Sequence, residues 1–192
     1  MTKEKTGKKI KSLGMEERIE IPTEITFSSE NHVLTMKKGN KEIKRQFDRD
    51  LLLSSEGNSI IIKTLNSKKD ERRKMGSAKS HIKNMIEGLN SEFEYELEIC
   101  NVHFPITVTY DKAKSEFLVK NFLGEKSPRR INAAKNVDVE IKAPVIKIKS
   151  YDLEAAGQTA ANLEKITKIR NRDRNKFQDG IFITKKPGKV YS

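Results

Sequence analysis

Residues 68–99 have the sequence KKDERRKMGSAKSHIKNMIEGLNSEFEYELEI and contain both kinds of element from which this chain is built. In the first part, apolar residues recur at steps that keep one stripe on a 3.6-residue period, which predicts an amphipathic helix. The stripe comprises Met75, Ala78, Ile82, Met85, Ile86 and Leu89. In the last part, residues 93–99, apolar and acidic residues alternate, which predicts a strand with one buried face.

The same two signals occur on both sides of this stretch. Before it, we expect one strand over residues 19–27, a hairpin turning at Lys38–Lys41, and two short strands over 51–53 and 60–62. After it, the alternation changes parity at Cys100–Asn101, which predicts a bulge or bend before a strand over 102–110. Further elements are then expected: strands over 117–122, 137–141, 145–148 and 180–184, and a helix over 156–169.

Each half of the chain therefore contains several strands followed by one helix. The two halves also share a weak internal sequence repeat, in which Gly39 and Arg45 correspond to Gly124 and Arg130 at a constant offset along the chain. We predict an α+β protein of two tandem, similar domains, each an antiparallel or mixed sheet packed against one helix. The expected division is a basic arm (1–18), a first domain (19–89), a second domain (90–184) and a loose polar tail (185–192).

Charge is the strongest compositional signal. The 192 residues include 39 Lys and Arg against 27 Asp and Glu, which gives a net charge of +12. The cations gather in four clusters, over residues 3–11, 68–83, 120–135 and 165–176, each with a net charge of +4 or +5. A basic solvated surface explains a high net charge, but clusters of like charge favour a polyanionic partner such as nucleic acid.

The acidic residues are arranged differently. Glu92, Glu94, Glu96 and Glu98 alternate along one face of the strand over 93–99. We expect that face to turn away from phosphate or toward a basic neighbouring protein.

The sequence favours a cytoplasmic protein. The first 18 residues are polar and Lys-rich and lack the apolar region of a secretory signal. No stretch approaches the roughly 20 apolar residues of a membrane span. Cys100 is the single cysteine, so no internal disulfide forms, which fits a reducing compartment.

Signals for catalysis are weak. The histidines are His32, at a turn, His81, on the helix, and His103, three residues after Cys100. An odd spacing places Cys100 and His103 on opposite faces of a straight strand, and two ligands do not make a metal site. The run from Gly124 to Ser127 lacks the glycine pattern of a phosphate-binding loop. We predict no catalytic residues, no metal and no cofactor.

The loop over residues 120–130 suits contact with folded RNA. Arginine forks and lysine ammonium groups bind phosphate, and glycine at position 124 lets the backbone approach closely. Proteins recognise structured RNA through shape, phosphates and 2′-hydroxyls, and the absence of Trp disfavours a stacking platform for single strands.

Four motifs together resemble the universal L-six family of large ribosomal subunit proteins, most closely its eukaryotic branch, called L-nine in the older naming. The motifs are Ser80–Gly88, His103–Ile106, Asn121–Lys126 followed by Arg129 and Arg130, and Lys176–Ile181. The resemblance covers roughly residues 17–187. It implies two similar α+β domains and a structural role without catalysis or cofactor, in the large subunit near the stalk base and the sarcin–ricin loop.

The resemblance also implies that RNA contacts come largely from the second domain, through the loop over 121–130 and the end over 170–186. Partners would be large-subunit ribosomal RNA and neighbouring ribosomal proteins, with no membrane and no small-molecule substrate. A free RNA-binding or chaperone module, and a small phosphodiester-cleaving enzyme using His81 or His103, are the alternatives. The candidate RNA-binding residues are Lys120, Asn121, Gly124, Lys126, Arg129, Arg130, Arg170, Arg172, Arg174, Lys176, Lys185, Lys186, Arg72, Arg73, Lys74, Lys79 and Lys83.

Overall fold

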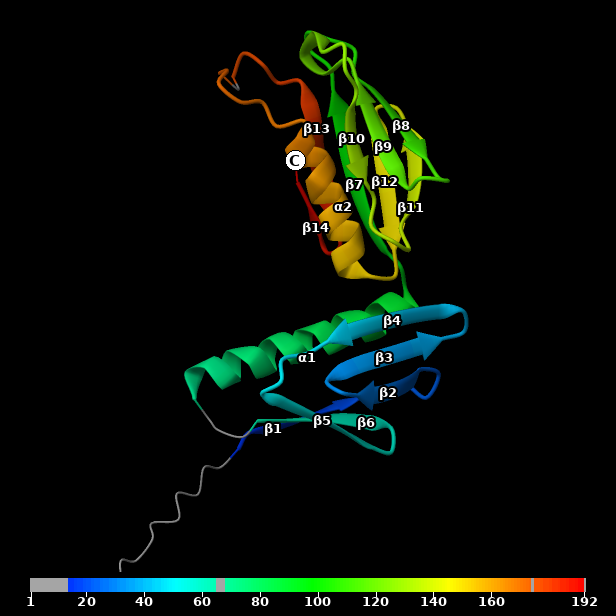
Figure 1. The fold of residues 1–192 in the computed structure, drawn as a ribbon, viewed down its shortest axis with the longest axis vertical. Coiled ribbons are helices and arrows are strands. Elements are labelled where there is room, and N and C mark those ends of the chain that lie inside the picture. The colour runs from blue at the N-terminus through cyan, green and yellow to red at the C-terminus, as the bar shows by residue number, and fades with distance from the viewer. Residues whose placement is uncertain (1–13, 65–67, 174, 192) are drawn as a thin grey trace, which may run out of the picture. The chain divides into compact units, whose positions relative to one another are not determined.

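The computed structural model describes residues 14–64, 68–173 and 175–191. It contains two compact units, residues 1–86 and 87–192, and the division falls inside the last turns of a helix. Each unit combines antiparallel strands in two sheets with one helix (Figure 1). The predicted α+β class with two similar domains is confirmed. The arm over residues 1–18 lies mostly outside the described residues.

The first unit has six strands before its helix. They are β1 (Glu16–Glu20), β2 (Thr26–Glu30), β3 (Val33–Lys38), β4 (Lys41–Gln46), β5 (Leu51–Glu56) and β6 (Ser59–Thr64). One sheet has the order β1-β6-β5, and the other has the order β2-β3-β4. The predicted hairpin is confirmed, because β3 and β4 pair up to Lys38 opposite Lys41, with Gly39 in the turn at a positive φ of 58°.

Helix α1 (Lys69–Asn90) completes the first unit. The predicted stripe is confirmed, since Met75, Ala78, Ile82, Met85 and Leu89 are all buried and Ile86 is half-buried. Polar side chains along its flank reach the strands: His81 contacts Arg45 on β4, and Lys79 pairs with Glu17 on β1. The apolar stripe therefore seats the helix on its unit.

The second unit has eight strands and α2 (Leu153–Ile166). The strands are β7 (Phe93–Cys100), β8 (Thr107–Asp111), β9 (Glu116–Lys120), β10 (Arg129–Asn132), β11 (Asp138–Lys142), β12 (Val145–Ser150), β13 (Gly180–Lys186) and β14 (Lys189–Val190). One sheet has the order β11-β12-β7-β13-β14, and the other has the order β10-β9-β8. The short helix η1 (Phe122–Gly124) follows β9.

Helix α2 covers the central strands β12, β7 and β13 (Figure 1). Its Ala156, Ala160 and Leu163 are fully buried in a core that includes Leu97 of β7 and Ile148 of β12. Gly157 allows this close approach, because a Cβ atom there would lie 2.9 Å from the hydroxyl of Tyr95. Asp152 begins the helix by accepting a hydrogen bond from the backbone N–H of Glu154 at 2.9 Å.

Two predicted strands are interrupted. The strand expected over 19–27 is wrong as one element: β1 ends at Glu20, and β2 begins at Thr26 in a different sheet. Between them, Pro22 accepts a hydrogen bond from the N–H of Ile25, which closes a turn. The strand expected over 102–110 is wrong in its first half, since residues 101–106 form a loop and Val102 is 58% exposed.

Two segments near strand ends also differ from expectation. The strand predicted over 117–122 ends at Lys120, because Asn121 turns the backbone to a positive φ of 59°. The tail over 185–192 was expected to be loose, but it forms regular structure as far as Val190. Strand β13 continues to Lys186 and pairs with β14, with Lys185 opposite Val190.

Two glutamates of the acidic face of β7 are paired within the chain, whereas Glu98 is exposed, and the expectation that this face turns away from phosphate or toward a basic neighbouring protein stays a prediction. Glu96 pairs with Lys147 of β12 at 3.1 Å and with Lys185 of β13 at 3.3 Å. Glu94 pairs with Lys149 at 3.2 Å. The hydrogen bond to Glu96, together with both glutamate charges, raises the pKa of Lys147. These cross-strand pairs stabilise the sheet on its open face.

Candidate nucleic-acid interface

The loop after β9 has a fixed shape. Asn121, Leu123 and Gly124 all have positive φ, at 59°, 50° and 79°. The side-chain amide of Asn121 donates to the backbone oxygen of Pro105 at 3.1 Å, and Phe122 is buried. Gly124 lies against the ring of Phe104, where an added Cβ would approach to 3.2 Å. Asn121 and Gly124, two candidate RNA-binding residues, therefore shape this loop.

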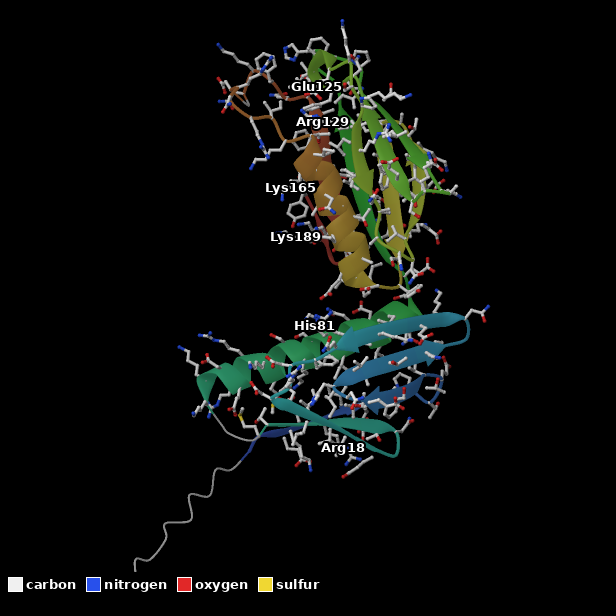
Figure 2. The ribbon with its side chains drawn as sticks, viewed as in Figure 1. Arg18, His81, Glu125, Arg129, Lys165 and Lys189 are labelled. Atoms are coloured by element: carbon white, nitrogen blue, oxygen red, sulfur yellow. The ribbon has the colours of Figure 1, made fainter. Side chains whose placement is uncertain are left out.

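Arg129 ties the loop to the end of α2. Its guanidinium donates to both carboxylate oxygens of Glu125, at 2.7 and 2.5 Å, and to the backbone oxygen of Ile166. It also lies 4.3 Å from the centre of the Phe122 ring. The hydrogen bond from Arg129, against the opposing effect of burial, lowers the pKa of Glu125. Figure 2 labels both residues at the end of the second unit where α2 terminates. Arg129 thus acts first as a structural clamp.

The segment after α2 carries exposed cations, and hydrogen bonds of Thr167 hold its backbone in place. The hydroxyl of Thr167 donates to the backbone oxygen of Leu163 at 3.3 Å and accepts from the N–H of Ile181 at 3.0 Å. This buried threonine links the helix end to β13. Lys165, Lys168 and Arg170 are exposed around it (Figure 2 labels Lys165).

A hollow of about 540 Å³ brings the two basic segments together. The loop over 122–129 forms one part of its wall, and the segment over 165–172 forms the rest. The structure therefore places Arg129, Arg170 and Arg172 around one hollow. Lys165 and Lys168 line it too, although neither was among the candidate residues; their place in the charge cluster over 165–176 was the available signal.

Asp179 holds the loop over 101–106 at the same end of the unit. Its side chain is fully buried, and its Oδ1 accepts hydrogen bonds from the N–H groups of Val102, His103 and Phe104 at 2.9, 2.7 and 3.2 Å. Its Oδ2 lies 2.7 Å from Nδ1 of His103. Burial alone would raise the pKa of Asp179, but these hydrogen bonds outweigh it and lower the pKa to about 2.

His103 continues into an aromatic stack. Its ring centre lies 5.0 Å from that of Phe177, and the guanidinium of Arg172 lies 4.8 Å from the Phe177 ring centre. Arg172 is therefore partly held by the protein itself.

The remaining candidates of the second unit differ in how they are engaged. Arg130 is 3.9 Å from Glu116 and largely exposed. Lys185 pairs with the glutamates of β7, and Lys186 lies 5.1 Å from the Tyr191 ring centre. Arg174 lies outside the described residues.

Six exposed cations of the second unit form no ion pair within the described part of the chain. We call this set the basic end of unit 2; it comprises Lys120, Lys126, Lys165, Lys168, Arg170 and Lys176.

In the first unit the candidates follow α1, and most are paired. Lys74 lies 2.8 Å from Asp48 and also contacts Asp50, and these hydrogen bonds raise its pKa. Lys79 pairs with Glu17, and Arg73 lies 3.5 Å from Asp70. Arg72 and Lys83 are exposed and form no ion pair with any other described residue. The structure therefore does not assemble these five residues into one open cationic site.

The groups considered for catalysis are engaged structurally. Nε2 of His81 lies 3.0 Å from the guanidinium of Arg45, and Nδ1 of His32 lies 3.2 Å from the backbone oxygen of Leu51. Burial raises the pKa of Cys100, which disfavours its thiolate. The described residues include no group of three or more His, Cys, Asp or Glu side chains placed to hold a metal ion, and no helix among them is long and apolar enough to cross a membrane.

Comparison with known proteins agrees with the motifs. The large ribosomal subunit protein uL6 of Aeropyrum pernix is 36% identical over 175 residues, which cover 90% of this chain and 95% of the relative. This chain belongs to the ribosomal protein L6 family. The family model described as Ribosomal protein L6 matches residues 104–180. The uL6 proteins of Methanococcus vannielii and Haloarcula marismortui are 36% and 34% identical, over 91% and 89% of this chain and 95% and 96% of the relatives.

The predicted family is thereby confirmed. These relatives are archaeal, so the narrower resemblance to the eukaryotic branch stays a prediction. The family match covers the loop over 121–130 and Asp179, the residues that shape the basic end of unit 2.

Proposed function

We propose that this protein is a structural component of the large ribosomal subunit that binds folded ribosomal RNA. Two observations support this proposal. The relatives are named large ribosomal subunit protein uL6, and the basic end of unit 2 offers six exposed cations that form no ion pair with any other described residue. A rigid loop loses less conformational entropy on binding than a mobile one, so cations held in this way bind phosphate more favourably.

We further propose that the protein works without catalysis or cofactor, in the cytoplasm, near the stalk base and beside other ribosomal proteins. The engagement of His81 and His103 with Arg45 and Asp179 supports a structural role for both histidines. The observation that carries the proposal is the hollow of about 540 Å³, where two separate basic segments converge.

The test is the salt dependence of binding to large-subunit ribosomal RNA. If the six cations each neutralise one phosphate, log Kd should change with log salt at a slope of about 4 to 5. The double variant Lys126→Glu, Arg170→Glu should lower this slope by about 2. The matched control reverses Lys112 and Lys114, exposed residues in the turn between β8 and β9, and should leave the slope unchanged.

A slope near one for the unaltered protein would contradict the proposal, because it would leave no extended phosphate contact. An equal loss in the two double variants would show that net charge alone, not the basic end of unit 2, determines binding.

A further inference from the structure

A second and larger hollow lies in unit 2. Its volume is about 970 Å³, and it shares Lys165, Lys168 and Arg170 with the first hollow. The rest of its wall is largely apolar, with Val102, Ile169 and Phe182 among the residues that form it. Val102 is 58% exposed, so part of this apolar wall is open to solvent.

The walls of this hollow are held in place. Val102 is fixed because its N–H donates to Asp179, and Phe182 lies over Gly180, where an added Cβ would come within 3.1 Å of the ring. Two acids belong to the lining. The carboxylate of Asp179 is fully buried and directed at the loop amides, and Glu164 on α2 is half-buried. The exposed charge at the rim is therefore mainly that of Lys165, Lys168 and Arg170.

Building on the function proposed above, we propose that this hollow receives one unstacked nucleobase of the bound RNA. An apolar, aromatic wall bordered by cations matches a nucleotide, whose base is flat and apolar on its faces and whose flanking phosphates are anionic. RNA is recognised in this way at loops and bulges, where bases are free to leave the stack. The three cations would contact the phosphates on either side of the inserted base.

Cys100 provides a direct readout, because it lines the hollow and is the only cysteine in the chain. The experiment measures its alkylation by iodoacetamide at about pH 8.5, with and without saturating large-subunit ribosomal RNA transcript. Burial raises the pKa of this thiol, so alkylation of the free protein is slow but measurable. We expect the RNA to slow it at least about tenfold. The control variant Cys100→Ser, Val190→Cys carries its thiol on exposed β14, where we expect less than a twofold change.

A pair of charge variants tests the same hollow by affinity. Val102→Glu places a carboxylate in the hollow without touching the core, because this side chain is exposed. We expect about a tenfold loss of RNA affinity, within the range that one stacked base contributes. Val190→Glu adds the same charge at another exposed valine of the unit and should change affinity by less than twofold.

The outcomes separate this proposal from the function on which it rests. Two results together would overturn the base site and leave ribosomal RNA binding intact: unchanged RNA affinity of Val102→Glu, and unslowed alkylation of Cys100 in the RNA-bound unaltered protein. Protection of Cys100 only after other large-subunit proteins are added would assign the hollow to a protein and also overturn it. If the unaltered protein did not bind the ribosomal RNA transcript at all, both proposals would be contradicted.

Discussion

Replacement of Asp179 by asparagine tests the buried network that holds the loop over 101–106. The pKa of Asp179 is about 2 in the fold, against an ordinary value of 3.8. One pKa unit corresponds to about 1.4 kcal/mol, so the ionised carboxylate stabilises the fold by about 2 kcal/mol. Asparagine keeps the Oδ1 acceptor that serves three backbone N–H groups but loses the charge. We expect Asp179→Asn to lower the free energy of unfolding by about 2 kcal/mol at pH 7.

The pH dependence follows from the direction of the shift. Because the pKa is lower in the folded state, the stabilisation is complete above about pH 5 and is lost as the pH falls through about 2. The difference between the unaltered protein and Asp179→Asn should therefore shrink over that range. Asp179→Ala removes the acceptor as well and leaves three N–H groups unpaired, so we expect a larger loss, roughly 4 kcal/mol.

Urea unfolding followed by tyrosine fluorescence measures this effect selectively. The chain has no tryptophan, and its four tyrosines all lie in the second unit. The control Asp138→Asn alters an exposed aspartate on β11 and should change stability by less than about 0.5 kcal/mol. Equal stability of Asp179→Asn and the unaltered protein at pH 7, or a difference that persists at pH 2, would refute this explanation of the network.

Three further predictions concern the other ion pairs. Arg129→Lys loses the two-point bond to its glutamate and should lower the stability of the second unit by about 1–2 kcal/mol in the same urea assay; no change would contradict the clamp. Glu96→Lys places a third cation beside Lys147 and Lys185, so the melting temperature of this variant should be lower than that of the unaltered protein. The decrease should be smaller in about 0.5 M NaCl, because salt screens the repulsion; a decrease that does not depend on salt would exclude charge as the cause. Lys74→Met leaves two aspartates unpaired, and thermal melting followed by circular dichroism should show a lower midpoint for the first unit; an unchanged midpoint would show that the pairs are negligible.

The sequence predicted elements well wherever the periodicity was local and unbroken. Strand β7 follows the alternation over residues 93–99, and the buried face of α1 follows its stripe from Met75 to Leu89. Prediction failed at residues 101–106, which alternate like a strand but form a loop. The competing partner is Asp179, more than 70 residues later, which accepts the N–H groups that a sheet would have used. No local pattern contains that information.

The candidate interface was predicted in composition but not in geometry. Sequence clusters identified the segments over 120–135 and 165–176, which the hollow of about 540 Å³ brings together. They could not distinguish Arg129, whose guanidinium is bound to Glu125 and Ile166, from Lys126, which is exposed. Charge counts also missed that Lys185 neutralises glutamates of β7, because register across three strands determines that pairing.

Crosslinking of this protein to RNA inside purified large ribosomal subunits tests the central claim most directly. We predict that the protein sediments with these subunits and that its RNA crosslinks concentrate at the basic end of unit 2, with Lys126, Lys165 and Lys168 among the modified residues. Crosslinks confined to the first unit, or absence of the protein from large subunits, would contradict the claim.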